Sequence, residues 1–236
     1  MTSRTGNGLL IVTIDGPAGS GKSTVAKAAA ARTGLKYLDT GKLYRAIALY
    51  LSTMEIPPIE TASLRATLNR LSLRLDGDRV LLGKDDVTEV LHTAEVDRIV
   101  SLYAALPAVR EALLAIQRSQ AQPPGLVADG RDMGSVVFPE ANLKIFLTAD
   151  ATERARRRFL EQSSRGEPVE FGQVLSTVLS RDKTDSTREI APIVVPEKAV
   201  VLDTTSKTAA EVVSEVVCLI EKMKEMGESR EDFDAL

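Results

Sequence analysis

Apolar runs that end in polar residues recur along the chain and predict a layered architecture around a parallel sheet. Leu9–Ile14 is a β-branched run that ends in Asp15-Gly16-Pro17, and strong helix formers begin at Lys22. This pattern predicts a strand, a glycine turn and a helix. Further strands are predicted at the segments 37–38, 126–128, 143–147 and 200–202. The strands at 126–128 and 143–147 are followed by polar residues, at the strand end where open α/β sheets bind ligands.

Helical periodicity predicts the remaining regular elements. Helices are expected over the segments 41–51, 95–106, 108–120, 151–162, 171–181 and 209–223. The pair Pro57-Pro58 stops the first of them, and Pro107 fits as an early residue of the third. Strands that alternate with helices in this order predict an α/β fold of three αβα layers around a central parallel sheet.

One segment departs from this alternation. Leu71, Leu73 and Leu75 alternate with polar residues, and Asp76-Gly77-Asp78 then leads into the apolar run 80–82. Alternation interrupted by Asp-Gly predicts an antiparallel hairpin. We expect it to be a small insert in a single domain over residues 9–223, followed by a polar C-terminal tail over 224–236.

Composition excludes several classes of protein. Hydrophobic residues make up 44% and charged residues 27% of 236 residues, as in soluble globular proteins. The longest apolar stretches fall short of the roughly 20 residues that a membrane helix needs. The polar N-terminus predicts no cleaved secretory signal, and hence a cytoplasmic protein. One cysteine, Cys218, and one histidine, His92, exclude an intramolecular disulfide and the usual zinc sites.

Two further expectations follow from these counts. Any catalytic metal should be bound by oxygen atoms, and Cys218, in an apolar helical run, is expected to pack in the core. The net charge of −3 does not favour nucleic acid as a partner, yet arginines concentrate in the segments 154–158 and 181–188. Local basicity in a nearly neutral chain indicates a small polyanionic ligand.

The strongest chemical signal lies at the first glycine turn. Residues 16–23 match the pattern G-x-x-x-x-G-K-S/T, after an apolar strand and before a helix. In such a P-loop, backbone amides and the helix N-terminus cradle phosphates, Lys22 reaches the β- and γ-phosphates, and the Ser23 hydroxyl ligates Mg²⁺. The predicted ATP-binding residues of this loop are Gly16, Pro17, Ala18, Gly19, Ser20, Gly21, Lys22, Ser23 and Thr24.

A P-loop alone does not distinguish a kinase from a GTPase or a motor ATPase. The Asn-Lys-x-Asp motif of GTPases does not occur in the chain, and its small size with dispersed arginines favours a small-molecule kinase. At the end of the strand at 126–128, Asp129 is either a carboxylate that holds the water shell of Mg²⁺ or the cap of a turn. We favour the metal role, which makes Ser23 and Asp129 the predicted metal site.

Five segments resemble the nucleoside monophosphate kinases, and more closely the bacterial cytidylate kinases. They span nearly the whole chain in order: Asp15-Gly16-Pro17 with the P-loop, Leu38–Gly41 with Leu43-Tyr44-Arg45, Asp86-Val87-Thr88, Ala128–Gly134 with Val137-Phe138-Pro139, and Arg181-Asp182 with Asp185 and Arg188. The resemblance implies transfer of the γ-phosphoryl group of ATP to CMP or dCMP with Mg²⁺. It also implies a helical lid at about 153–170 and an acceptor-binding insert at about 63–105.

The resemblance assigns roles to matching positions. Arg45, Arg131 and Arg188 would grip the acceptor phosphate near Tyr44, while Ser101, Arg110 and Asp132 would contact cytosine and Asp185 the ribose. Thr40 and Arg181 complete the predicted acceptor site. Several Arg forks suit a phosphate, and a carboxylate can read the exocyclic amine of cytosine. Without the resemblance, Arg110 and Ser101 are ordinary helix-surface residues.

Arginines of the segment 154–158 resemble those of the family's lid. Arg154 and Arg158 share a helix face and would close over the ATP phosphates, whereas Arg156 is turned away and is expected to be solvated. Arg157 is assigned to ATP binding. Phosphoryl transfer needs positioning and charge neutralisation rather than a general base. The predicted catalytic residues are therefore Lys22, Asp129, Arg131, Arg154, Arg158 and Arg188.

Two alternatives remain open. One is another small-molecule P-loop kinase, of the uridylate/cytidylate or shikimate type, against which the segment Asp129–Gly134 and the hairpin argue. The other is a nucleotide-binding regulator without an acceptor, which leaves the second arginine cluster unexplained. The expected partners are ATP and CMP or dCMP, with no nucleic acid and no membrane, and analogy with the family suggests a monomer.

Overall fold

The structure is a computed structural model that describes residues 9–166, 168–187 and 190–234. It divides into two compact units. The first comprises Met1–Leu38 and Ala121–Leu236, and the second is the continuous segment Asp39–Gln120. No single helix of the described residues is long and apolar enough to cross a membrane. The consecutive helices Glu95–Ala104 and Pro107–Ser119 pass such a test together, with a bend of 97° at the break between them.

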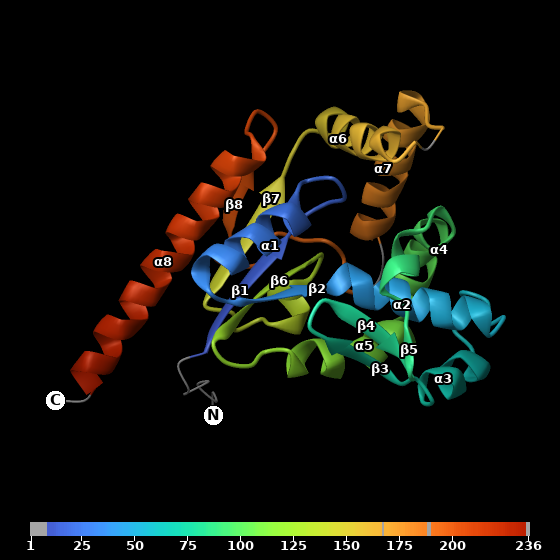
Figure 1. Cartoon of the computed structure of the whole chain (residues 1–236), viewed down its shortest axis with the longest axis horizontal. Coiled ribbons are helices and arrows are strands. Elements are labelled where there is room, and N and C mark those ends of the chain that lie inside the picture. Colours follow the sequence, from blue (N-terminus) through green and yellow to red (C-terminus); the bar gives the residue numbers. More distant parts are fainter. Residues whose placement is uncertain (1–8, 167, 188–189, 235–236) are drawn as a thin grey trace. The chain divides into compact units, whose positions relative to one another are not determined.

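A five-stranded sheet organises the first unit, with strand order β2-β6-β1-β7-β8 (Figure 1). The strands are β1 (Leu10–Asp15), β2 (Lys36–Asp39), β6 (Gly125–Gly130), β7 (Leu143–Thr148) and β8 (Val200–Asp203). β1 pairs in parallel with β6 and β7, and β7 pairs in parallel with β8. The register sets Asp15 opposite Gly130, so the carboxyl ends of β1 and β6 coincide.

Two helices pack on this sheet through a shared apolar core. Helix α1 (Lys22–Thr33) and the long helix α8 (Ala209–Asp234) contact each other (Figure 1). Their buried residues lie with those of β1, β6 and β7 in one cluster. Along α8 the buried positions are Val212, Val213, Val216 and Ile220, a spacing that follows the helical period.

Helices α6 (Ala151–Ser164) and α7 (Phe171–Thr187) pack side by side, and the predicted lid, at about residues 153–170, covers most of α6 and the segment before α7. Among the described residues, the buried hydrophobic cluster of this contact consists of Ala155, Val174 and Val178, with Phe159, Val169 and Leu175 partly buried against it. The rings of Phe159 and Phe171 meet edge to face, with centroids 6.1 Å apart. The Asp150 carboxylate caps α6 by accepting a hydrogen bond from the amide of Thr152.

The second unit contains four helices and a small antiparallel sheet. The helices are α2 (Thr40–Thr53), α3 (Ala62–Leu68), α4 (Ala94–Ala104) and α5 (Pro107–Ser119), with a 3₁₀ helix at Thr88–His92. The strands β3 (Leu73–Asp76), β4 (Arg79–Leu82) and β5 (Asp85–Asp86) form the sheet, and β3 and β4 are the predicted hairpin. Helix α2 packs against α4, and its fully buried side chains include Leu43 and Ile47.

The α/β fold class and the predicted strands and helices are confirmed, with some differences. Helix α7 ends at Thr187 instead of residue 181 and α8 ends at Asp234 instead of 223, while α3, β5 and the 3₁₀ helix Thr88–His92 were not predicted. The expectation that Cys218 packs in the core is wrong, because this cysteine is exposed. It follows the buried Val216 by two positions, which is about 200° around the helix and therefore on the opposite face.

Candidate active site

The phosphate loop joins β1 to α1 in a conformation that only glycine adopts without strain. Gly16, Gly19 and Gly21 have φ angles of +150°, +78° and +88°. A Cβ atom on Gly16 would lie 2.0 Å from the carbonyl oxygen of Leu147, and one on Gly19 would lie 3.0 Å from that of Arg154. The loop is thus pressed against the end of β7 and the start of α6. Its glycines leave backbone amides at the N-terminus of α1 for an anion.

Lys22 is buried and folds back on its own loop. Its Nζ donates to the carbonyl oxygen of Pro17 at 2.6 Å and lies 3.5 Å from the Oγ of Ser20. Burial is the main cause that lowers the pKa of this ammonium, and Arg131 lowers it further, whereas three carboxylates oppose the shift: Asp129, Asp15 and Asp185. The phosphates of a bound nucleotide would bring negative charge to a cation that burial disfavours.

Ser23 and Asp129, the predicted metal ligands, are in direct contact. The Ser23 hydroxyl donates to the Oδ2 of Asp129 at 2.8 Å, and the hydroxyl of Tyr37 donates to Oδ1 at 3.0 Å. Among the described residues there is no group of three or more His, Cys, Asp or Glu side chains that could hold a metal. Mg²⁺ commonly takes one or two protein oxygens and fills its octahedron with waters and substrate phosphates. The Ser23–Asp129 pair fits that mode of binding.

Asp15 ends β1 just before the loop and is completely buried. Its two carboxylate oxygens accept hydrogen bonds from the amides of Met133 and Gly134, each at 2.8 Å. Burial raises the pKa of Asp15 to about 6, although the two amides and Lys22 act in the opposite direction. The sequence analysis gave this residue no role, although a carboxylate at the end of a buried apolar strand is itself a signal.

We expect the elevated pKa of Asp15 to affect the pH dependence of stability. Between about pH 4 and 6 the folded state binds more protons at this site than the unfolded chain, so the free energy of unfolding falls as pH rises, by up to about 3 kcal/mol. Urea unfolding of the wild type and the Asp15→Asn variant across this range measures the effect. The difference between the two proteins should shift over that window and level off above it, and a flat difference would contradict the assignment.

Arg131 lies directly after β6 and is paired with another predicted site residue. Its Nε donates to the Oδ2 of Asp185 at 2.9 Å, and its Nη1 to the carbonyl oxygen of Gly130 at 3.4 Å. The neighbouring Asp132 is buried, and Arg181 on α7 is half-buried. Arg188, predicted to bind the acceptor phosphate, lies outside the described residues. The first unit therefore gathers Lys22, Arg131 and Asp185 into one charged group.

Arg154, predicted to close over the ATP phosphates, is buried against the phosphate loop. It donates to the carbonyl oxygens of Ala149 and Ala18, at 2.9 and 3.1 Å. Two further bonds, of 2.9 and 2.6 Å, go to the carboxylate of Asp182 on α7. Arg154, on α6, thus connects the phosphate loop to α7. Its role toward ATP stays a prediction, and Asp182 is a partner that the sequence did not indicate.

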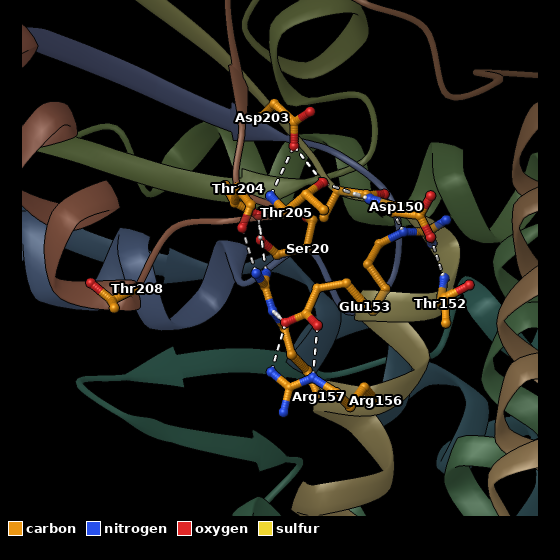
Figure 2. A network of polar contacts seen from close by, with 12 residues as sticks. Ser20, Asp150, Thr152, Glu153, Arg156, Arg157, Asp203, Thr204, Thr205 and Thr208 are labelled. Carbon is orange, nitrogen blue, oxygen red and sulfur yellow. Dashed lines mark hydrogen bonds and ion pairs between the residues drawn. The ribbon is translucent and has the colours of Figure 1, made fainter.

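Arg156 and Arg157 of α6 differ in their surroundings, as Figure 2 shows. Arg157 donates to the Oγ1 of Thr204 at 3.0 Å and to its carbonyl oxygen at 2.5 Å, and Thr204 in turn contacts the carbonyl oxygen of Ser20. The Glu153 carboxylate accepts from both Arg156 and Arg157, which lowers the pKa of Glu153 to about 2. Arg156 is exposed, as predicted.

The predicted acceptor residues of the second unit form two contacts. The guanidinium of Arg110 lies 5.4 Å from the centroid of the Tyr44 ring, in a cation–π geometry, and its Nη1 donates to the carbonyl oxygen of Ala104 at 3.2 Å. Arg45 donates from Nη2 to Asp97 at 3.0 Å, while its buried Nε bonds to no other residue that the structure describes. A buried donor without a partner suits an anionic ligand.

The remaining predicted residues are placed as follows. Thr40 is the buried first residue of α2, and Ser101 is half-buried on α4, both in the second unit. Arg158 is half-buried on α6 in the first unit. The predicted cytosine contacts are thus divided between the units, since Asp132 belongs to the first and Ser101 and Arg110 to the second.

Comparison with known proteins decides the family. The family model of cytidylate kinase matches residues 12–222, which include the phosphate loop, the hairpin and the predicted lid. The chain belongs to the cytidylate kinase family. The matched range contains the buried Lys22, the Ser23–Asp129 contact and the Arg131–Asp185 pair.

The alignments with individual relatives cover nearly the whole length of those proteins. The cytidylate kinase of Salinibacter ruber is 48% identical over 217 residues, covering 88% of this chain and 95% of that protein. The cytidylate kinase of an Exiguobacterium species is 43% identical over 219 residues, covering 91% and 98%. A crystal structure of an uncharacterized protein from Eubacterium ventriosum aligns with a TM-score of 0.52 at 12% identity, covering 90% and 98% of the two chains. That likeness concerns the fold alone.

Proposed function

We propose that this member of the cytidylate kinase family transfers the γ-phosphoryl group of ATP to CMP or dCMP, giving ADP and CDP or dCDP. The observation that carries the proposal is the family match over residues 12–222, which contains an intact phosphate loop with a buried lysine. The same geometry accounts for a charge-stabilised transfer that uses no covalent intermediate.

On the donor side, the chain's own groups bind and neutralise phosphate. We propose that the amides of the loop hold the β-phosphate and that Lys22 leaves the Pro17 carbonyl to meet the β- and γ-oxygens. Ser23 and Asp129 would hold Mg²⁺, which supplies charge neutralisation to the phosphates. Arg154, Arg157 and Arg158 would add positive charge from α6, with Arg154 fixed by Asp182.

On the acceptor side, we propose that Arg45, Arg131 and Arg188 bind the phosphate of the nucleoside monophosphate. The Nε of Arg45, which has no partner in the part of the chain that the structure describes, supports this, because a phosphate oxygen would satisfy it. Ser101, Arg110 and Asp132 would read cytosine and Asp185 the ribose. Burial of Asp132 supports base reading, since a buried carboxylate opposite the uracil carbonyl would be left without a donor.

The broader organisation belongs to the same proposal. Residues 9–223 would work as one kinase domain, with the insert at about 63–105 near the acceptor and the lid at about 153–170 over the donor. The protein would act as a monomer in the cytoplasm on small nucleotides. Its net charge of −3 supports the absence of nucleic acid among its partners.

An acceptor panel tests this function. With ATP and Mg²⁺, coupled ADP release should be strong with CMP and dCMP and weak with UMP, AMP, GMP and shikimate. The Asp132→Ala variant should lose about 100-fold or more in kcat/KM for CMP, because the base is no longer oriented. Glu140→Ala removes an exposed carboxylate eight residues away and should leave the rate unchanged. Preference for another acceptor, or full activity in Asp132→Ala, would contradict the proposed acceptor site.

A further inference from the structure

The turn that follows β6 is hydrogen-bonded to one buried carboxylate, that of Asp15. Both oxygens of Asp15 accept backbone hydrogen bonds at 2.8 Å, one from Met133 and one from Gly134. These are the two residues that directly follow Arg131-Asp132. A carboxylate that binds consecutive amides restrains the position and the tilt of the peptide between them, and such charge-assisted bonds are roughly twice as strong as neutral ones.

The same turn is also held by hydrogen bonds of its own backbone. The carbonyl oxygen of Asp132 accepts from the amides of Val136 and Val137, at 2.9 and 3.2 Å, within the π-helical turn Met133–Val137. Packing is tight as well, because a Cβ atom on Gly134 would lie 2.8 Å from the Oγ1 of Thr13 and 3.0 Å from the Cγ of Pro196. Asp15 thus binds the backbone of a turn that is closely packed at Gly134.

We infer that Asp15 is a positioning residue for acceptor recognition, which fixes the backbone of residues 133 and 134 and thereby aims the side chains of Arg131 and Asp132. The inference rests on the proposed function, in which these two side chains grip the acceptor. Asp15 does not touch the acceptor in this account, and it acts only through the turn. Its place at the end of β1, one residue before the phosphate loop, makes one strand end serve both nucleotides.

A competing account routes the effect of Asp15 through the donor. Asp15 raises the pKa of Lys22, so its charge also reaches the phosphate-binding lysine. If that were its main role, its loss would change the binding of ATP and the turnover number rather than the binding of the acceptor. The two accounts therefore predict different kinetic constants.

The decisive variant is Asp15→Asn in the full chain. The amide oxygen of asparagine can accept from one backbone amide, but its NH₂ group then faces the other donor. We expect the KM for CMP to rise about tenfold and the preference for CMP over UMP to fall several-fold, as for a small misplacement of binding groups. The KM for ATP should stay within about twofold. An unchanged KM for CMP with an altered KM for ATP or kcat would overturn the inference in favour of the Lys22 route.

Two further variants guard against a purely structural effect. Gly134→Ala displaces the same turn while the Asp15 carboxylate stays in place, so it should reproduce the rise in the KM for CMP. Ile14→Val removes one methyl group from a fully buried side chain of β1 that lies in the apolar core with residues of α1 and α8, and it should leave all constants unchanged. An effect of Ile14→Val equal to that of Asp15→Asn would mean that general disturbance of the strand is the cause, and would overturn the inference.

Amide hydrogen exchange separates failure of this inference from failure of the proposed function. The amides of Met133 and Gly134 should exchange at least tenfold faster in Asp15→Asn than in the wild type, whatever the acceptor is. If the wild type makes no CDP but the exchange difference is present, the proposed function fails while the anchoring of the turn is confirmed. If the wild type makes CDP and the exchange rates are equal, the positioning role is wrong.

Discussion

Replacement of Lys22 by methionine should lower kcat/KM by about 10³-fold while the protein stays folded. Methionine fills a similar volume but cannot neutralise charge on the transferring phosphoryl group. The fold should tolerate the change, because the hydrogen bonds of Nζ within the described residues go to its own loop, to Pro17 O and Ser20 Oγ. A change in the free energy of unfolding of about 1 kcal/mol or less is therefore expected. Steady-state kinetics and thermal melting of the same preparation measure both quantities.

The matched control for this variant is Lys27→Met on the same helix. Lys27 is exposed and lies more than one turn away, so its loss should leave both activity and melting temperature near the wild-type values. Activity in Lys22→Met within tenfold of the wild type would contradict the proposed catalytic role of this lysine. A large loss of melting temperature would instead show that Lys22 supports the fold.

Gly16→Ala should destabilise the protein and disable the loop together. The added methyl group would lie 2.0 Å from the carbonyl oxygen of Leu147, a backbone atom that cannot rotate away, and φ of +150° is unfavourable for alanine. Strain and overpacking together should lower the free energy of unfolding by about 3 kcal/mol or more. The melting temperature should fall by about 6–12 °C, and ATP binding should weaken as the loop moves.

Gly172→Ala is the control for this substitution. Gly172 lies in the first turn of α7, has no atom within 4 Å of an added Cβ and does not require a positive φ. Alanine there should be neutral or stabilising by up to about 1 kcal/mol, because it favours helix. Equal melting temperatures for the wild type and Gly16→Ala would show that the loop accommodates a side chain, and the close packing against β7 would then be without consequence.

Local sequence signals predicted the elements that carry the phosphate loop. Three signals lie within 25 residues: the β-branched run of β1, the glycine turn, and the helix formers from Lys22 onward. Each can be recognised from the residue types of its own segment. The hairpin of β3 and β4 was likewise given by alternation around Asp-Gly. Periodicity failed for Cys218, because a fully apolar run does not reveal which face of the helix is buried until the packing partner is known.

Contacts between distant residues could not be predicted in the same way. Asp15 and Met133 are 118 positions apart, and nothing around Asp15 indicates that its partners are two backbone amides. Arg154 was predicted as a phosphate ligand from its helix, but its bonds to Ala18 and Asp182 depend on how α6 meets the loop and α7. The resemblance implied residue roles, whereas the contacts that those side chains make are visible only in the structure.

On the acceptor side too, the sequence indicated residues, and the structure shows their contacts. Tyr44, Arg45 and Arg110 were named as binding residues, and the structure adds how they are held: Arg110 over the ring of Tyr44 and Arg45 against Asp97. Asp97 had no signal in the sequence beyond a place in the first turn of a helix. It leaves the Nε of Arg45 without a partner among the described residues, which is the feature that an acceptor phosphate would satisfy.

Identification of the product tests the central claim most directly. The full chain is incubated with Mg²⁺, CMP and ATP that carries ¹⁸O in its γ-phosphoryl group, and the nucleotides are separated and weighed by mass spectrometry. The account predicts CDP that carries the labelled phosphoryl group, with ADP formed in equal amount and only when CMP is present. Labelled inorganic phosphate in place of labelled CDP, or ADP formed at the same rate without CMP, would contradict it.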